Sequence, residues 1–413
     1  MRAGTKNPSF AKGSEDLRDY LDLKVDPKQV ERVTERIGTA RCAQRDAEVA
    51  QYLSLPLAER KAKPEGVTAP ALAVVSVDGG RLQIRRDAQA ATPAVDADGT
   101  EEALPADDQH RGKHWREDKI GLLMTMTSEA QTQDPCPEVP PAFVDPTRIA
   151  KLARELKTKK AAHQEAASQT ETPEAVEQVL REEGQAVKWQ PPEVADKHLA
   201  ATRRPWAAFG PMVAQAAWKL GFYQAPRRAF VGDGSDNVWA VWRNHCSSFV
   251  PILDIIHAIS YVFASAMAGR RFADGWPHYQ RWMAWVWQGA VEKVIVELAQ
   301  RQAELGSPQE QDGETHPRRV VSTALGYLQN HQDKMRYPEY RRQGMPITSS
   351  YVESAVKQFN ARVKGTEKFW TEAGAEALLC LRADYLSSGT VLADFWQDRQ
   401  DNATGQTCYQ LAA

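Results

Sequence analysis

The chain of 413 residues lacks long apolar runs, and its five cysteines are scattered without a C-x-x-C pair. A membrane-spanning helix needs about 20 consecutive apolar residues, so the sequence predicts none. The N-terminal stretch also lacks the apolar core of a signal peptide. The cysteine spacing argues against a disulfide framework and against a zinc finger. Together these absences predict a cytoplasmic protein with reduced thiols.

Net charge is also nearly absent. At −2, the total charge indicates no general affinity for nucleic acid. The basic residues are unevenly distributed, however, because residues 318–368 contain ten Lys or Arg against four Asp or Glu. Such a segment fits a phosphate-binding surface or an ordinary solvated face, and charge alone does not separate the two.

The clearest strand pattern is the apolar run 72–77, which ends at Asp78. The glycines that follow Asp78 suggest a turn, and the alternation at 81–85 predicts a hairpin partner. Residues 119–126 also alternate and predict a third strand, so the three would form an antiparallel meander. A second buried-type run, 229–231, ends two residues before Asp233. Since catalytic groups collect at the carboxyl ends of strands in open sheets, both acids are candidate site residues.

Further candidates come later in the chain. One more apolar run ends on Asp254, with His257 three residues later. Ser349 and Ser350 offer an N-cap for a helix whose first turn contains Glu353. The face of this helix next to Glu353 is otherwise polar and basic, which suits a surface that holds a DNA backbone.

Carboxylates such as Asp78, Asp233 and Glu353 are the oxygen ligands that Mg²⁺ and Mn²⁺ prefer. Two such ions about 3.5–4 Å apart can promote the displacement of a phosphodiester. Each acid also has an ordinary structural explanation, because Asp-Gly pairs occur in turns and Glu353 fits a helix capping box. Asp254 and His257 could equally form a structural hydrogen-bonded pair. The spacing leaves these alternatives open.

The region between the second and third candidate acids is helical in pattern and rich in tryptophan. Eight of the twelve tryptophans lie between Trp206 and Trp287. They could stack on bases, but an aromatic core is the more frequent use. The predicted segments are a helical N-terminal arm (1–67), the first part of the core (68–265, with a loop at 87–113 and a helical segment at 128–200), a helical insertion (266–336), the completion of the core with the acidic helix (337–395) and a C-terminal tail (396–413).

The order of several blocks resembles prokaryotic insertion-sequence transposases of the DDE class, particularly the ISKra-type group. The similarity covers roughly residues 70–390, and the blocks are specific only in combination. They are V-S-V-D-G-G-R around Asp78, W-x-E-x-K at 115–119, G-D-G-x-x-x-x-W at 232–239, L-D-x-x-H at 253–257, and a Ser-rich turn with V-E-S and R-x-K at 349–364, followed by Trp370.

This resemblance implies an α/β, RNase H-like fold with a mostly helical insertion between the second and third acids. It implies that Asp78, Asp233 and Glu353 bind two Mg²⁺ or Mn²⁺ ions, and that Asp254 and His257 support them. The implied reaction is cleavage at transposon ends followed by strand transfer into target DNA. The 1–67 segment is then an accessory arm or the remainder of a longer DNA-binding region.

The implied partner is DNA, and a homodimer or larger synaptic assembly is expected because two transposon ends must be paired. Two other interpretations remain open: a transposase-derived DNA-binding protein without catalysis, and an RNase H-like nuclease. The basic residues expected to contact DNA are Arg341, Arg342, Lys357, Arg362 and Lys364.

Overall fold

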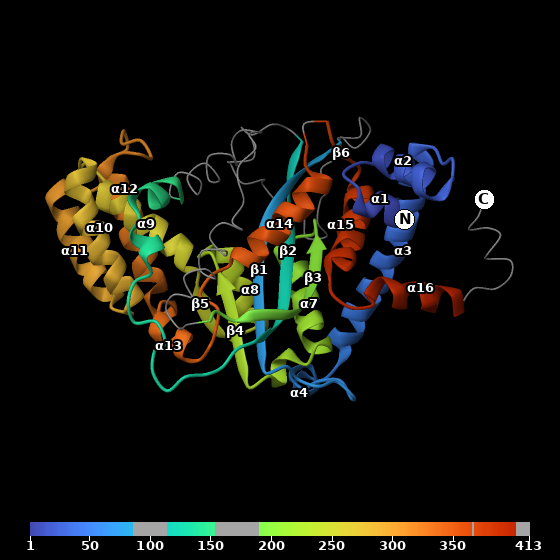
Figure 1. Ribbon diagram of the computed structural model, residues 1–413, viewed down its shortest axis with the longest axis horizontal. Coiled ribbons are helices and arrows are strands. Elements are labelled where there is room, and N and C mark those ends of the chain that lie inside the picture. The colour runs from blue at the N-terminus through green and yellow to red at the C-terminus, as the bar shows by residue number, and fades with distance from the viewer. Residues whose placement is uncertain (86–113, 153–189, 366, 402–413) are drawn as a thin grey trace, which may run out of the picture.

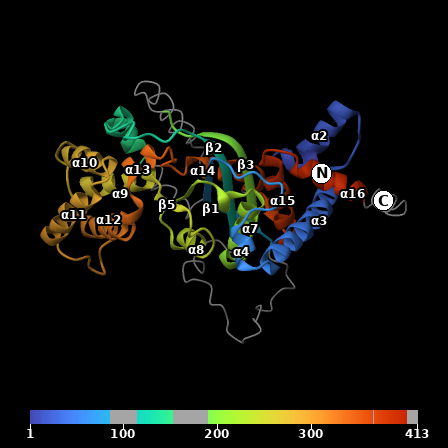
Figure 2. The ribbon, with the colours of Figure 1, turned by 90° about the horizontal axis from the view of Figure 1, so that it is seen from below.

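A computed structural model describes residues 1–85, 114–152, 190–365 and 367–401. A central sheet lies between a bundle of helices at one end and the N-terminal helices at the other (Figures 1 and 2). The predicted loop at 87–113 lies outside the described residues. Within the described ranges, none of the helices has the length and apolar character needed to cross a membrane.

The sheet is mixed and follows the order β3-β2-β1-β4-β5, with the short β6 paired to the end of β1. β1, β2 and β3 pair in antiparallel fashion, whereas β4 is parallel to β1 and β5 is parallel to β4. The predicted α/β class is confirmed at this level. The strands are β1 Leu72–Ile84, β2 Trp115–Thr127, β3 Glu193–Thr202, β4 Arg227–Gly232, β5 Val250–Leu253 and β6 Phe369–Trp370.

Strand β1 continues through Asp78 and the two glycines after it, so the predicted turn and hairpin at this point are wrong. Its antiparallel partner is β2. Gly80 lies opposite Asp118 of β2, and a Cβ at Gly80 would stand 2.9 Å from the Asp118 carboxylate oxygens. Gly79 similarly faces Glu117 at 3.3 Å. These glycines admit side chains of the neighbouring strand rather than turn the chain.

The helix predicted over 128–200 is replaced in part by other structure. Residues 128–140 are irregular, Pro141–Val144 form a 3₁₀ turn, and residues 146–152 are helical. The segment ends in β3, which is the third strand of the meander. β3 is an edge strand with many half-exposed side chains, so it lacks the apolar alternation that identifies strands in sequence. Residues 153–189 lie outside the described part.

Helices cover both faces of the sheet. Gly121 of β2 contacts Phe209 and Val213 of α7, which places α7 on one face. Helix α14 packs on β1 and β2. Because side chains alternate along a strand, Asp78, which pairs with Ile120 next to Gly121, points to the face opposite α7. The helices of this central part are α7 Trp206–Lys219, α8 Asp236–His245, α14 Ser350–Val363 and α15 Glu372–Leu386, whereas α16 Val391–Asp401 lies next to the N-terminal helices (Figure 1).

The helices after β5 form the bundle at the left of Figure 1 and run from Ile255 to Arg342, beyond both limits of the predicted insertion. Trp282 and Trp287 are buried in it, as expected for an aromatic core. Trp287 donates a hydrogen bond to the carbonyl of Cys136 over 2.8 Å, so the chain after β2 packs against the bundle. The helices are α9 Ile255–Met267, α10 Phe272–Trp287, α11 Val291–Leu305, α12 Pro317–His331 and α13 Tyr337–Arg342.

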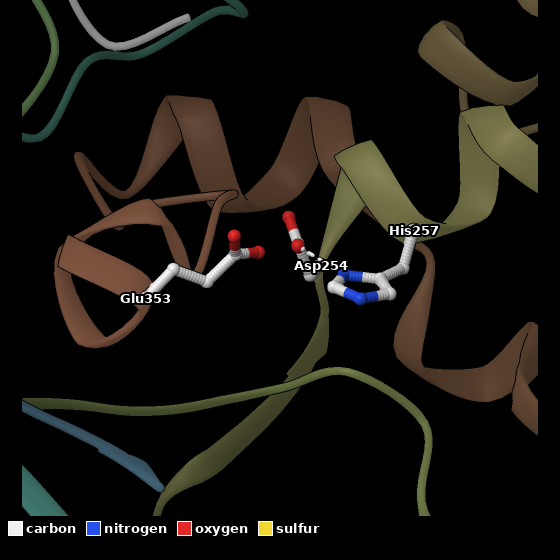
Figure 3. Close-up of side chains that lie close together, drawn as sticks. All are labelled: Asp254, His257 and Glu353. Carbon is white, nitrogen blue, oxygen red and sulfur yellow. Dashed lines mark hydrogen bonds and ion pairs between the residues drawn. The ribbon is translucent and has the colours of Figure 1, made fainter. Parts of the chain in front are cut away.

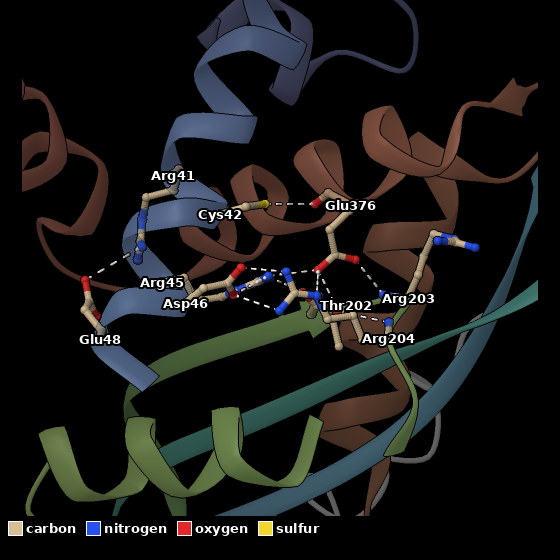
Figure 4. A network of polar contacts seen from close by, with 10 residues as sticks. Arg41, Cys42, Arg45, Asp46, Glu48, Thr202, Arg203, Arg204 and Glu376 are labelled. Atoms are coloured by element: carbon tan, nitrogen blue, oxygen red, sulfur yellow. Dashed lines mark hydrogen bonds and ion pairs between the residues drawn. The ribbon is translucent and has the colours of Figure 1, made fainter. Parts of the chain in front are cut away.

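The N-terminal helices pack against the core at the other end. Helix α3 lies along α15, where Arg41 forms a 2.9 Å ion pair with Asp384 and Arg45 forms one of 2.9 Å with Glu376. Glu376 also accepts a hydrogen bond from Thr202 at the end of β3, which completes the network in Figure 4. The arm is therefore joined to α15 by a buried ion pair and to the end of β3 through the half-buried Glu376. Its helices are α1 Arg2–Lys6, α2 Phe10–Leu21, α3 Pro27–Ser54 and α4 Leu57–Lys61.

Candidate functional site

Three acids lie in one row across the parallel strands. The register pairs Ser76 of β1 with Val231 of β4, so Asp78 and Asp233 each follow this pair by two residues. Asp254 continues the row, because Gly232 pairs with Leu253 and the Asp254 N–H donates to the Gly232 carbonyl over 2.8 Å. Strands β4 and β5 end here while β1 continues. The row therefore stands at the carboxyl ends of two strands, where sites form in open sheets.

Glu353 reaches this row from helix α14. Ligand atoms of Glu353, Asp254 and His257 all lie within 4.8 Å of one another, a spacing that could hold a metal ion. Figure 3 shows the Glu353 carboxylate turned toward Asp254. A capping box places its acid three residues after the N-cap, so Glu353 would belong to a box that starts at Ser350. In the structure the N-cap is Ser349, so Glu353 is one residue beyond the capping-box position.

The pKa of Asp78 depends on the charges of the other two candidate ligands, Asp233 and Glu353. Burial, followed by the negative charges of Asp233 and Glu353, raises the pKa of Asp78 to about 7. A hydrogen bond of 2.7 Å from the Gly79 N–H and the charge of His257 oppose this rise. Because the charges of Asp233 and Glu353 raise the pKa of Asp78, this part of the protein carries more negative charge than its surroundings neutralise. A bound divalent cation would supply the missing positive charge, so the donor set fits Mg²⁺ or Mn²⁺.

Asp254 differs from the other acids because its charge is already compensated. One oxygen accepts from the Ile256 N–H over 3.1 Å, and the other contacts His257 Nδ1 at 2.6 Å and accepts from Ser349 at 2.8 Å. Burial would raise the Asp254 pKa, but the bonds from His257 and Ser349 outweigh it and lower the pKa below its usual value. Although Asp254 lies close enough to ligate, its filled oxygens suit an orienting role better.

His257 is the positive member of this pair. Burial alone would lower the pKa of His257, but the bond to Asp254 and the charges of Asp254, Glu353 and Asp233 raise it to about 9. The imidazole is therefore protonated at neutral pH. It places a positive charge beside the cluster of acids, with Nδ1 committed to Asp254 and Nε2 left for other contacts.

The loop that carries Asp233 is held by the insertion. Gly234 adopts a φ of +101°, and a Cβ there would lie 2.6 Å from the ring of Tyr327 on α12. The Tyr327 hydroxyl donates to the Asp233 carbonyl over 2.8 Å, and its ring stacks on Tyr261 with centroids 3.8 Å apart. Sequence reasoning missed Tyr327, since 94 residues separate it from Asp233 and no local pattern marks it.

Two of the basic residues expected to contact DNA are engaged inside the protein. Arg341 is fully buried, forms an ion pair with Asp134 and lies 4.0 Å from the centre of the Trp287 ring. Arg362 is 2% exposed and donates two hydrogen bonds to the carbonyl of Gly4 in α1. Buried guanidinium groups cannot reach a DNA backbone from these positions, so the structure does not favour their predicted role.

The other three basic residues are more accessible. Lys364 is exposed at the end of α14, with its ammonium 5.6 Å from the centre of the Trp115 ring. Lys357 is half-buried on the same helix, and Arg342 forms a 2.7 Å surface ion pair with Glu339. These side chains can still face a polyanion.

A further acid, which is buried, lies on the same sheet face as Asp78. Asp118 is fully buried, and neither carboxylate oxygen accepts a hydrogen bond from another residue among those described. Burial raises its pKa to about 7. The W-x-E-x-K block at 115–119 drew attention only to its tryptophan, glutamate and lysine, so sequence reasoning missed Asp118.

No protein-family model matches the chain, and no curated protein matches its sequence.

Proposed function

We propose that the protein is a DDE-class DNA transposase that cuts DNA at transposon ends and joins the freed ends to target DNA. The observation that carries this proposal is the placement of Asp78 and Asp233 side by side, two residues after the paired Ser76 and Val231, with the charges of Asp233 and Glu353 acting on Asp78. These acids come from a central strand, a loop after the next strand and a distant helix. The mixed sheet and the helical bundle between Asp233 and Glu353 support an RNase H-like interpretation of the fold.

The three carboxylates would hold Mg²⁺ or Mn²⁺. When bound, two such ions would activate the attacking oxygen and stabilise the leaving oxygen of a phosphodiester. Asp78 is fixed within a continuous strand, and Asp233 is fixed by the contact of its loop with Tyr327. His257 adds a positive charge next to the acids, and Asp254 orients the ring of His257. The chain thus supplies rigid ligands and one fixed cation, as positioning of phosphate chemistry requires.

Lys364, Lys357 and Arg342 are the residues of the basic segment that we propose contact the DNA backbone. Arg341 and Arg362 are left out because they are buried. Lys357 lies on helix α14 with Glu353, and Lys364 follows the last residue of that helix, so a backbone bound there would run past the acidic site. Cleavage of two ends in one complex further implies a homodimer or larger assembly on DNA.

The test uses purified protein, Mg²⁺ or Mn²⁺, and labelled DNA that contains the sequences flanking its own gene. We expect nicked strands and then joined products. Asp78→Asn, Asp233→Asn and Glu353→Gln should each lower the rate about a thousandfold or more, since each removes a ligand contribution of several kcal/mol. Asp274→Asn, at an exposed pair with Arg271 on the insertion, is the matched control and should retain the wild-type rate.

The products separate the proposal from its nearest alternative. Hydrolysed ends without any joined strand would indicate an RNase H-like nuclease. DNA binding without cleavage under all metal conditions would indicate a binding protein. Full activity in either Asp233→Asn or Glu353→Gln would show that the assigned triad is wrong.

A further inference from the structure

Ser349 stands at the N-cap of α14 but does not cap the helix. An N-cap serine normally accepts a hydrogen bond from a backbone N–H of the first turn. Ser349 makes no such bond, and its backbone (φ −92°, ψ 10°) is outside the extended conformation typical of an N-cap. Its hydroxyl, which is buried, donates instead to Asp254 over 2.8 Å. The Ser349 hydroxyl therefore contacts Asp254, 95 residues earlier in the chain, and no N–H group of its own helix.

The Ser349 hydroxyl completes the set of donors around Asp254. Three donors from three directions, Ser349, His257 and the Ile256 N–H, leave the carboxylate little freedom to rotate. His257 in turn has its Nδ1 held 2.6 Å from Asp254. The plane of the imidazole is therefore set by the carboxylate, and the carboxylate is partly set by Ser349.

A purely structural role for this hydroxyl is poorly supported, because other bonds already hold the same segment. The Ile255 N–H donates to the Ile347 carbonyl over 3.0 Å. Tyr337 and Tyr340 donate to carbonyls of β5, those of Leu253 and Pro251, over 3.1 Å each. These contacts attach the chain before α14 to β5 and α9 without Ser349. What Ser349 adds is the contact with the carboxylate that faces His257.

We propose that Ser349 is a positioning residue, whose hydroxyl fixes the Asp254 carboxylate and thereby orients the ring of His257 beside Glu353. Helix α14 would then carry both an acid of the site and the group that aligns its histidine. The structural part of this inference stands by itself. The consequence for DNA cleavage rests on the proposed function.

Ring ¹⁵N resonances of His257 in metal-free protein test the structural part. The protein would be labelled with ¹⁵N-histidine and the signals assigned with His257→Gln. In the wild type we expect a protected, slowly exchanging proton on Nδ1. Ser349→Ala and Ser349→Val should broaden or lose that signal, whereas Ser349→Thr, which has the shape of valine but keeps a hydroxyl, should retain it.

Ser350 provides the matched control. It is the next residue, its side chain is equally buried, and its hydroxyl has no hydrogen-bond partner among the described residues. Ser350→Ala should leave the His257 signals unchanged. An unchanged Nδ1 proton in folded Ser349→Ala or Ser349→Val would overturn the proposal. If both unfold, loss of the signal in Ser349→Thr would overturn it instead.

The DNA assay provides a second readout. If the protein cleaves DNA, Ser349→Ala should lower kcat about 10- to 100-fold, the usual range for partners of site residues. KM for DNA should stay the same, and Ser349→Thr should restore kcat. If no variant or wild type cleaves DNA while the His257 signals respond as expected, the proposed function fails and the positioning role stands. If DNA is cleaved but the His257 signals do not respond, the positioning role fails and the proposed function stands.

Discussion

The Tyr327 hydroxyl on α12 donates a 2.8 Å hydrogen bond to the backbone carbonyl of Asp233, 94 residues earlier in the chain. The insertion therefore does more than separate the second and third acids. Through Tyr327 it supports the loop of Asp233. The contact with Asp254 comes instead from Ser349, at the start of α14.

Tyr327→Phe should lower the free energy of unfolding by about 1 kcal/mol, because one partly buried hydrogen bond is lost. It should also lower the rate of DNA cleavage about 10- to 100-fold by loosening Asp233. Tyr279→Phe is the control, since it removes a 2.7 Å bond from the insertion to the Phe143 carbonyl, in the segment after β2 and away from the acids. Urea unfolding and cleavage rates check both. Equal rates for the two variants would contradict a role for Tyr327 at the site.

Asp78→Asn should stabilise the metal-free protein at pH 8, by about 0.5–2 kcal/mol, because it removes a charge that repels Asp233 and Glu353. Mg²⁺ should stabilise the wild type by up to about 2.7 kcal/mol at 100 times its Kd, and this gain should disappear in the variant. Chelation with EDTA should reverse it. Thermal unfolding with and without Mg²⁺ provides the measurement. A variant that keeps the full Mg²⁺ response would remove Asp78 from the metal site.

Asp118→Asn should change how stability depends on pH. Burial raises the folded-state pKa of Asp118 to about 7, against about 3.9 when unfolded. The unfolded chain therefore releases the proton first, and the contribution of Asp118 to stability is full below pH 4 and lost as pH rises to 7. The variant should be more stable than the wild type at pH 8, by on the order of a few kcal/mol, and the difference should shrink toward pH 4. Urea unfolding of both proteins at intervals from pH 4 to 8 measures this difference. If their free energies of unfolding differ by the same amount at every pH, the prediction is wrong.

The sequence identified the local elements but not their long-range partners. The apolar run before Asp78 predicted a strand correctly, yet the turn after it was wrong because Gly80 is required by Asp118, a residue of another strand. Ser349 was interpreted as an ordinary cap, since nothing nearby marks its contact with Asp254. β3 was missed because an edge strand held mainly by backbone bonds needs little apolar alternation.

The basic residues show the same limit. Charge pattern placed Arg362 with Lys364 on one DNA-facing helix, but local spacing cannot show that the Gly4 carbonyl lies over Arg362. A guanidinium can be buried only where it finds hydrogen-bond acceptors. For Arg362 the acceptor is the carbonyl of Gly4, which is far away in the sequence and is identified only from the structure. Prediction of site residues from sequence was therefore most useful where the chemistry itself, as for clustered acids, demands a particular residue type.

Lys364→Ala should weaken DNA binding and reduce the slope of log K against log salt by about 0.9, because an exposed lysine that meets a phosphate releases about one counterion. Arg362→Lys should leave the slope unchanged. It keeps the charge but disrupts the paired bonds to Gly4, so it should lower the free energy of unfolding and loosen α1. Fluorescence anisotropy with labelled DNA in EDTA, repeated from about 50 to 200 mM salt, measures the slopes, and proteolysis of the N-terminal helices reports the release of α1. If Arg362→Lys lowers the slope while Lys364→Ala does not, the DNA path lies over the buried arginine, and the α1 contact must open when DNA binds.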